Sequence, residues 1–306
     1  MITKSCYYDF SEKQFVSKFD EKGRVSFFYI LIFVALFTTI TNVFAADEIP
    51  KERIKDGKKD PEIAYQNALD YILGKFTPTP HYKNAIEWLR LHEKTRPAKS
   101  DYLLGYIYAN GLGVKRDNKM AITYFKRAAD KGHPESLYQI GFYYESQAVE
   151  TEEQNPKMTN EIEKYYSEAI RYYEKASESG LAIAQFRLGL LYYNKQKNYE
   201  IARKWLLKAS EQGIIEAQIK LIKMYMFGQG LALGESVKEN DYIEAWKWCF
   251  VAEAQGADAD RKTLISYMEK RTNLRNVMEQ GLQHAIEFLK DKPQLRIILE
   301  ETKVEN

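Results

Sequence analysis

The sequence predicts an all-α protein built as a solenoid of about five helix-turn-helix repeats. In five places an Ala is followed three residues later by an aromatic residue: Ala85/Trp88, Ala121/Tyr124, Ala169/Tyr172, Ala202/Trp205 and Ala245/Trp248. In four of the five, a Gly stands eleven residues after the Ala, at Gly132, Gly180, Gly213 and Gly256. Offsets of 0, 3 and 11 share one helix face, and Gly is a common C-terminal stop. Each segment therefore predicts a helix, here called helix B, that ends in a Gly turn.

A second helix, here called helix A, precedes each helix B. Its marker is an aliphatic residue followed in three copies by Gly: Leu69/Asp70, Leu104/Gly105, Ile140/Gly141, Leu188/Gly189 and Leu221/Ile222. Four copies carry a Tyr three residues after this pair (Tyr108, Tyr144, Tyr192, Tyr225) and a Ser or Ala five residues before it (Ser100, Ser136, Ala184, Ala217). Small, aliphatic and Tyr positions at this spacing form one stripe of a helix.

The loops between helix A and helix B differ in length. Two carry insertions, at 145–164 and 228–241. We expect the first part of 145–164 to be an exposed loop, and 159–164 to extend helix B backward from a cap at Thr159 or Asn160. Asp117, Asn198 and Asp241 stand four residues before the helix-B Ala, where an N-cap is expected.

Residues 102–132 (YLLGYIYANGLGVKRDNKMAITYFKRAADKG) resemble the Sel1-like repeat, a relative of the tetratricopeptide repeat. They carry its pattern of LG, Tyr, GxGV, Asp, Ala, aromatic and AAxxG. Segments 181–213 and 214–256 fit with gaps, and 61–96 is degenerate. The resemblance implies a right-handed α/α solenoid with repeats at 62–96, 97–132, 133–180, 181–213 and 214–256. Residues 257–306 then predict capping helices that cover the last repeat.

The N-terminal 45 residues predict a targeting segment. An apolar run, FFYILIFVALF at 27–37, follows Lys22 and Arg24 and precedes Val43-Phe44-Ala45, a processing site of the small-x-small type. We expect a signal peptide cleaved after Ala45, which places the repeats outside the cytoplasm, in the periplasm or secreted. The alternative is an uncleaved anchor, because residues 25–46 are just long enough to span a bilayer. The charged residues 46–61 predict a flexible leader.

Charge and cysteine usage exclude several classes of protein. The net charge is +2, from 45 basic and 43 acidic residues of mixed order, so we expect no nucleic-acid surface. The two cysteines, Cys6 and Cys249, exclude a disulfide framework. No acylation site for a lipid anchor is present. We expect Cys249 to act as a small buried hydrophobic residue.

The sequence shows no catalytic constellation. The four histidines (His81, His92, His133, His284) lack metal-ligand spacing, and no GxSxG motif occurs. We expect no catalytic residue, no metal and no cofactor. A cysteine-rich branch of the resembled family has been credited with β-lactam hydrolysis. The resemblance therefore implies one enzymatic alternative, a cell-wall or β-lactam hydrolase.

The remaining hypothesis is a binding scaffold whose helices A line the concave surface of the solenoid. Helix-A residues outside the Ser/Ala–aliphatic–Tyr stripe are available to a partner. The candidates are Gln139, Arg187, Lys220 and Lys223, together with Tyr102 and Tyr138. We expect an exported, monomeric adaptor that binds a protein or peptide partner, in envelope assembly, signalling or host interaction. A further alternative is a membrane-anchored regulator of a kinase or secretion system.

Overall fold

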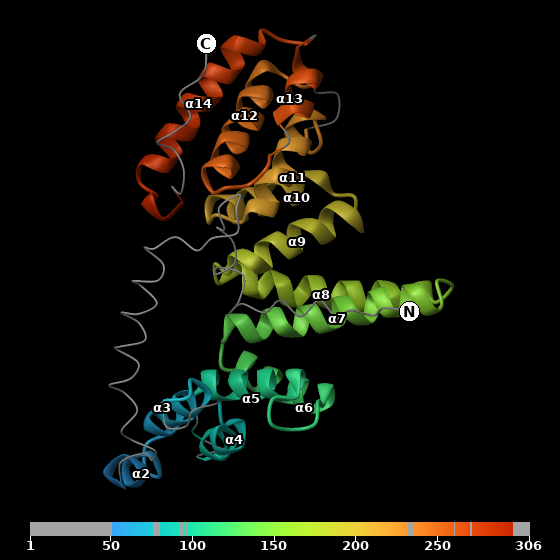
Figure 1. The fold of residues 1–306 in the computed structure, drawn as a ribbon. Coiled ribbons are helices and arrows are strands. Elements are labelled where there is room, and N and C mark those ends of the chain that lie inside the picture. Colours follow the sequence, from blue (N-terminus) through green and yellow to red (C-terminus); the bar gives the residue numbers. More distant parts are fainter. Residues whose placement is uncertain are drawn as a thin grey trace, which may run out of the picture. The chain divides into compact units, whose positions relative to one another are not determined.

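The computed structural model describes residues 51–75, 80–91, 95, 97–231, 236–259, 261–269 and 271–295. These residues form thirteen α-helices and one short 3-10 helix, with no strand among them (Figure 1). The all-α solenoid predicted from the repeats is confirmed. The chain divides into two units, residues 1–95 and residues 96–306, which we call unit 1 and unit 2.

Unit 1 holds one helix pair and an additional helix. Its helices are α2 (Lys51–Gly57), α3 (Pro61–Ile72) and α4 (Tyr82–Arg90). Helices α3 and α4 occupy the helix-A and helix-B segments of the first copy. Helix α2 lies within residues 46–61, where a flexible leader was expected, so that expectation is wrong for residues 51–57.

Polar contacts rather than an apolar stripe hold α2 against α3. The guanidinium of Arg53 lies 2.7 Å from the carboxylate of Asp70, which is buried and also meets Lys75 at 2.9 Å. Gly57 packs so closely on Trp88 that an added Cβ would lie 2.8 Å from its ring. Helix α2 is thus held by an ion pair to the buried Asp70 and by a glycine contact. Neither requires apolar residues at helical spacing, so the leader shows no hydrophobic pattern from which α2 could have been predicted.

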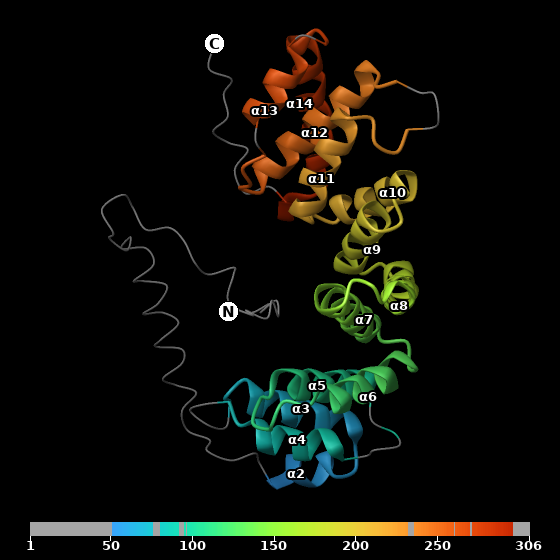
Figure 2. The same ribbon diagram turned by 90° about the vertical axis from the view of Figure 1, so that its right-hand side faces the viewer.

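Unit 2 contains four A–B pairs and a C-terminal cap. The pairs are α5 (Ala98–Asn110) with α6 (Asn118–Ala129), α7 (Pro134–Gln154) with α8 (Thr159–Glu178), α9 (Ala182–Asn194) with α10 (Tyr199–Glu211), and α11 (Ile215–Met226) with α12 (Glu239–Ala254). From α6 to α12, each helix packs on the one before it in the chain. The cap consists of α13 (Arg261–Met268), α14 (Leu274–Lys290) and η1 (Pro293–Leu295), and α14 packs on α12 (Figure 2).

Helix A carries a Gly in three copies because a large side chain of helix B packs directly against its backbone there. A Cβ added to Gly105, Gly141 or Gly189 would lie 2.6, 2.8 or 2.7 Å from Phe125, Tyr173 or Leu206, respectively. In the last pair the larger residue is on helix A: Ile222 takes the place of the Gly, and the smaller Cys249 takes the place of the large helix-B side chain. Both belong to one buried cluster. Cys249 is fully buried, as expected, and its burial raises the pKa of the thiol to about 12.

The four closing glycines adopt the left-handed backbone conformation that their place in the sequence predicts. Their φ angles are 80° at Gly132, 87° at Gly180, 94° at Gly213 and 84° at Gly256. A side chain would be strained at such angles. Two of the predicted caps are also found: Asp117 accepts hydrogen bonds from the amides of Lys119 and Met120, and Asn198 accepts one from Ile201. Asp241 instead lies at the third position of α12 and accepts from the Lys238 amide.

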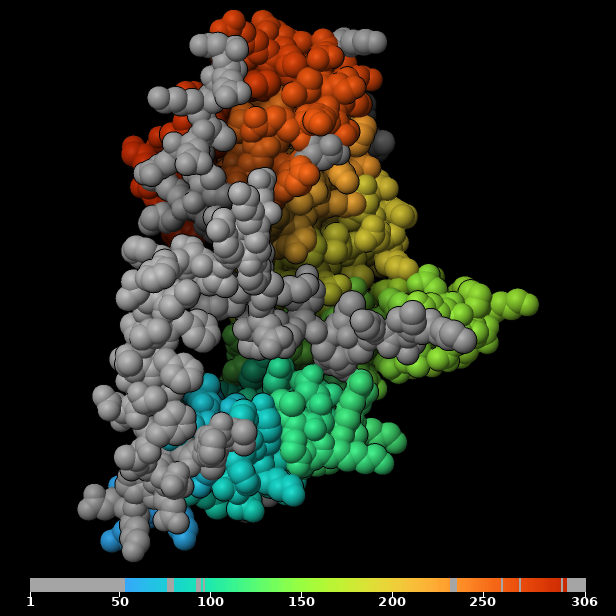
Figure 3. All heavy atoms as spheres, in the orientation of Figure 1, coloured from blue at the N-terminus to red at the C-terminus, as the bar shows by residue number. Residues whose placement is uncertain are grey.

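The insertion at 145–164 is helical on both sides of a short turn. Helix α7 continues to Gln154, and α8 begins at Thr159 after an N-cap at Met158 without a side-chain cap bond. The expected exposed loop is therefore limited to 155–158. The backward extension of helix B is confirmed, but the predicted cap at Thr159 or Asn160 is wrong, since both residues lie inside α8. The two helices form an antiparallel hairpin longer than the other pairs (Figures 1 and 3).

Two tyrosine–glutamate hydrogen bonds fasten this hairpin. Tyr173 donates to Glu145 at 2.7 Å, and Tyr166 donates to Glu152 at 2.9 Å. The two tyrosines are seven residues apart on α8, and the two glutamates are seven residues apart on α7. Seven residues make two helical turns, so the two bonds lie two turns apart along the antiparallel pair. Glu152 also accepts from Lys195 of α9 at 2.7 Å. The polar residues of the insertion led us to expect a loop, but several of them form these hydrogen bonds between helices.

Candidate functional site

The six candidate partner-binding residues all lie on helices A of unit 2. Tyr102 is on α5, Tyr138 and Gln139 are on α7, Arg187 is on α9, and Lys220 and Lys223 are on α11. All except Lys223 are half-buried. Five of them form contacts between one helix A and the next, and we call the row of six residues the A-helix seam.

The first step of the seam joins α5 to α7. Gln139 of α7 hydrogen-bonds the hydroxyl of Tyr102, whose pKa burial raises above its ordinary value. The Tyr102 ring also stacks on the imidazole of His133, with 4.8 Å between centroids. His133 lies at the N-terminus of α7, and its Nδ1 is 3.2 Å from the hydroxyl of the buried Ser136. This step is therefore a packed aromatic–polar contact that still exposes part of each side chain.

The second step joins α7 to α9 and gives Arg187 a structural role. Its guanidinium hydrogen-bonds Tyr138, lies 3.7 Å from the Glu145 carboxylate, and sits 5.6 Å from the centroid of the Phe142 ring. Burial lowers the pKa of Arg187, but Glu145 and the tyrosines outweigh this and hold it above the ordinary value. Arg187 was expected to have no role in the core; that expectation is wrong, because it bridges two helices beside the buried Tyr173.

The third step joins α9 to α11 through Lys220. Its ammonium lies 3.3 Å from the centroid of the Tyr193 ring, a cation–π contact. The Tyr193 hydroxyl donates to Gln229 in the loop after α11 at 2.8 Å. Lys223, one turn further on, is exposed. The seam thus ends in a cation bound to an aromatic ring and a second cation in solvent.

A row of polar contacts that the sequence analysis missed holds helix A to the end of its own helix B in three of the four pairs of unit 2. Gln212 donates to Gln185 at 2.8 Å, and Gln255 donates to Gln218 at 2.9 Å. In the α5–α6 pair Lys131 takes the same part, with its ammonium 2.6 Å from the buried Asp101 carboxylate. The signal was available, because these residues directly follow the small helix-A residue and directly precede the closing Gly.

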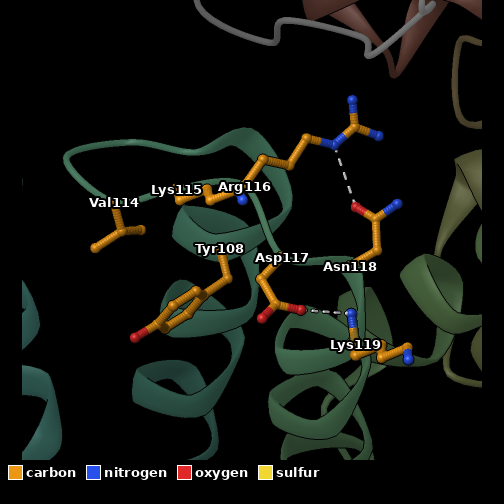
Figure 4. A pocket seen from close by; sticks show the side chains of 7 residues that line it. All are labelled: Tyr108, Val114, Lys115, Arg116, Asp117, Asn118 and Lys119. Atoms are coloured by element: carbon orange, nitrogen blue, oxygen red, sulfur yellow. Dashed lines mark hydrogen bonds between the residues drawn. The ribbon is translucent and has the colours of Figure 1, made fainter.

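A shallow pocket of about 740 Å³ lies in the α5–α6 loop. Figure 4 shows its lining: Tyr108, Val114, Lys115, Arg116, Asp117, Asn118 and Lys119. The Asp117 carboxylate is used as the cap of α6, and Arg116 Nε donates to Asn118 at 3.2 Å. The lining contains no His, Cys or Ser, and its carboxylate points at backbone amides, so this pocket presents no pair of groups for acid–base or nucleophilic catalysis.

The targeting segment predicted at 1–45 lies outside the described residues. Among the helices that the structure describes, none is long and apolar enough to cross a membrane. The cleaved signal and the uncleaved anchor therefore both stay predictions.

Comparison with known proteins identifies the repeats. The Sel1 repeat family matches residues 98–133, 162–181, 182–214 and 215–256. A sel1-like repeat-containing protein of Acanthamoeba polyphaga mimivirus is 26% identical over 154 residues, which cover 44% of this chain and 27% of the viral protein. The match thus spans about a quarter of that relative's length.

Two solved structures are similar to this chain. A Sel1 repeat protein from Oxalobacter formigenes is similar with a TM-score of 0.53 and 22% identity, over 76% of this chain and 88% of that protein. The protective antigen c5321 of uropathogenic Escherichia coli, which displays an SLR fold, has a TM-score of 0.46 and 20% identity, over 83% of this chain and 58% of that one.

Proposed function

Because the chain is a Sel1-repeat protein, we propose that it is an exported scaffold that binds an acidic segment of a partner protein along the A-helix seam. Sel1-repeat proteins are generally protein-interaction scaffolds. The export part of the proposal is supported by the apolar run at 27–37 and the processing site that ends at Ala45.

The observation that carries the binding surface is the sequence of side chains along the seam. Aromatic residues and arginine are enriched at protein interfaces, where they add contact area at low entropic cost. The seam offers these types half-exposed and already held in place by neighbours, so little side-chain entropy is lost on binding. Its last two cations, Lys220 and Lys223, favour a partner with carboxylates at that end.

Charge reversal at the seam tests this proposal. Arg187→Glu is unsuitable, because it would place a second carboxylate beside Glu145 and destabilise the α7–α9 contact. We would use Lys220→Glu with Lys223→Glu. The matched control is Lys204→Glu on α10, an exposed lysine 2.7 Å from Glu200.

The measurement is the affinity and association rate for a partner captured from the producing cell with wild-type protein. The double variant is expected to bind about tenfold or more weakly, mainly through a slower association rate that is sensitive to salt. Equal losses in the control, or none in the double variant, would exclude the seam. N-terminal sequencing of the native protein tests export separately, with a first residue of Ala46 expected.

A further inference from the structure

The C-terminal segment of the chain is seated on one of the Gly turns. The ammonium of Lys292, just before η1, donates to the backbone carbonyl of Glu211 at the last position of α10, at 2.9 Å. Leu295 covers Gly213, where an added Cβ would lie 2.6 Å from Leu295 Cδ2. Helix α14 runs back along α12 to bring this segment to α10 (Figure 1).

The chemistry of this contact suits a helix C-terminus. The last carbonyls of a helix have no partner within the helix and carry partial negative charge, so a cation there is stabilised. The Glu211 side chain adds attraction, which partly opposes the lowering of the Lys292 pKa by burial. The Leu side chain fits only because the closing residue is Gly. In this contact the lysine binds the backbone carbonyl of an acidic residue at the helix end. The leucine, three residues later, covers the Gly that stands two positions after that acidic residue.

The same turn occurs at two other places in unit 2, where no described residue covers it as Leu295 covers Gly213. Glu178 and Asp130, both exposed, stand two residues before Gly180 and Gly132, as Glu211 does before Gly213. The backbone is the same: in all three turns the Gly amide donates to the carbonyl three residues before, at 3.0, 2.8 and 3.0 Å for Gly180, Gly132 and Gly213. Among the described residues, a Cβ added to Gly132 or Gly180 would meet nothing within 4 Å.

The two uncovered turns differ in the residue between the acid and the Gly. At Gly132 this residue is Lys131, whose ammonium is bound to Asp101, and the added cation disfavours a second lysine. At Gly180 it is Ser179, whose hydroxyl donates to Lys175 O within its own helix. The Gly180 turn therefore keeps the acidic character of the occupied Gly213 turn.

We propose that the Gly180 turn is a second binding site, for a partner segment that places a lysine and, three residues later, a leucine on a single 3-10 turn, as in Lys292–Leu295. The lysine binds the end of α8 at Glu178, and the leucine covers Gly180. This site is independent of the A-helix seam, so failure of either proposal leaves the other unaffected.

The test uses the peptide DKPQL, residues 291–295 with blocked ends and a fluorine label, titrated into the full chain and followed by fluorine NMR. One equivalent is expected to bind, since the Gly213 turn is already covered. Glu178→Lys is expected to weaken binding about tenfold, the size of a charge-assisted contact. The matched control Asp130→Lys leaves binding unchanged. Peptides with norleucine for lysine, or alanine for leucine, bind less tightly in the same titration.

A second arm measures stoichiometry in the full-chain variant Lys292→Ala/Leu295→Ala. Releasing the chain's own segment opens the Gly213 turn, so the number of bound peptides is expected to rise from one to two. The proposal is overturned if the peptide does not bind. It is also overturned if Glu178→Lys has no effect, if Asp130→Lys abolishes binding, or if the stoichiometry stays at one.

Discussion

Replacing Gly189 with alanine tests the account of how helix A packs on helix B. An added Cβ would lie 2.7 Å from Leu206 Cγ, 3.0 Å from Leu206 Cδ2 and 3.3 Å from the Ala202 carbonyl oxygen. Leu206 is fully buried, so it cannot move aside freely. Overpacking of this kind costs about 1–3 kcal/mol, whereas Gly→Ala within a helix gains about 1 kcal/mol. Gly189→Ala is therefore expected to lower the free energy of unfolding by up to about 2 kcal/mol.

The sign of the effect should reverse once the facing side chain is shortened. Leu206→Ala alone is expected to cost about 2–5 kcal/mol through the cavity it leaves. In that background the overlap with Leu206 is gone and only the 3.3 Å contact with the Ala202 carbonyl oxygen remains, so Gly189→Ala should stabilise the protein by up to about 1 kcal/mol. Urea denaturation followed by far-UV circular dichroism, on all four proteins of the double-mutant cycle, measures both effects. If Gly189→Ala stabilises both backgrounds equally, the proposed contact does not set the identity of this residue.

Three further predictions concern buried polar groups. Burial holds the pKa of His133 below its ordinary value. Protonation of His133 thus favours the unfolded chain, so the free energy of unfolding falls as the pH drops through about 6.5. In urea titrations at several pH values, His133→Asn should lose this part of the pH dependence. The pKa of Cys249 is about 12. In a Cys6→Ser background, native protein should therefore resist thiol reagents until it unfolds, and this thiol's contribution to stability should be lost as the pH rises from about 8.5 to 12. Tyr173→Phe, which removes the hydroxyl of a fully buried side chain from its hydrogen bond to the half-buried Glu145, should cost about 1–3 kcal/mol in the same denaturation assay. The matched Tyr166→Phe, whose Glu partner is exposed, should cost less; equal costs would contradict the role given to burial.

The seam residues show where sequence reasoning about the site reached its limit. Their positions on helices A follow from the repeat frame, which could be read directly because period and face are local properties of the chain. Their contacts could not be read in this way. Arg187 was expected to be available because it lies outside the Ser/Ala–aliphatic–Tyr stripe of helix A, yet it is held by Glu145, which lies 42 positions earlier in the chain. Such a partner depends on how two helices are stacked, and nothing in the spacing around either residue encodes it.

The two errors in the element assignment have the same cause. The leader and the first part of the 145–164 insertion are polar and low in aliphatic residues, which is typical of loops. Each becomes a helix because its charged side chains find a buried or semi-buried partner on another helix, Arg53 on Asp70 and Glu145 on Tyr173. Periodicity of apolar residues reports burial by hydrophobic contact alone, so helices held by polar contacts are missed.

The repeat, its helix pairs and the four Gly turns could be read from the sequence alone, because they depend on helical periodicity and on the backbone freedom of glycine. The motif of residues 102–132 also indicated the family. Which side chain faces each helix-A Gly, and which turn the segment Lys292–Leu295 covers, became clear from the structure, because both depend on distances between residues far apart in the chain. These contacts follow from the packing of one repeat on the next: the same local frame is covered by Leu295 at Gly213 but by none of the described residues at Gly180.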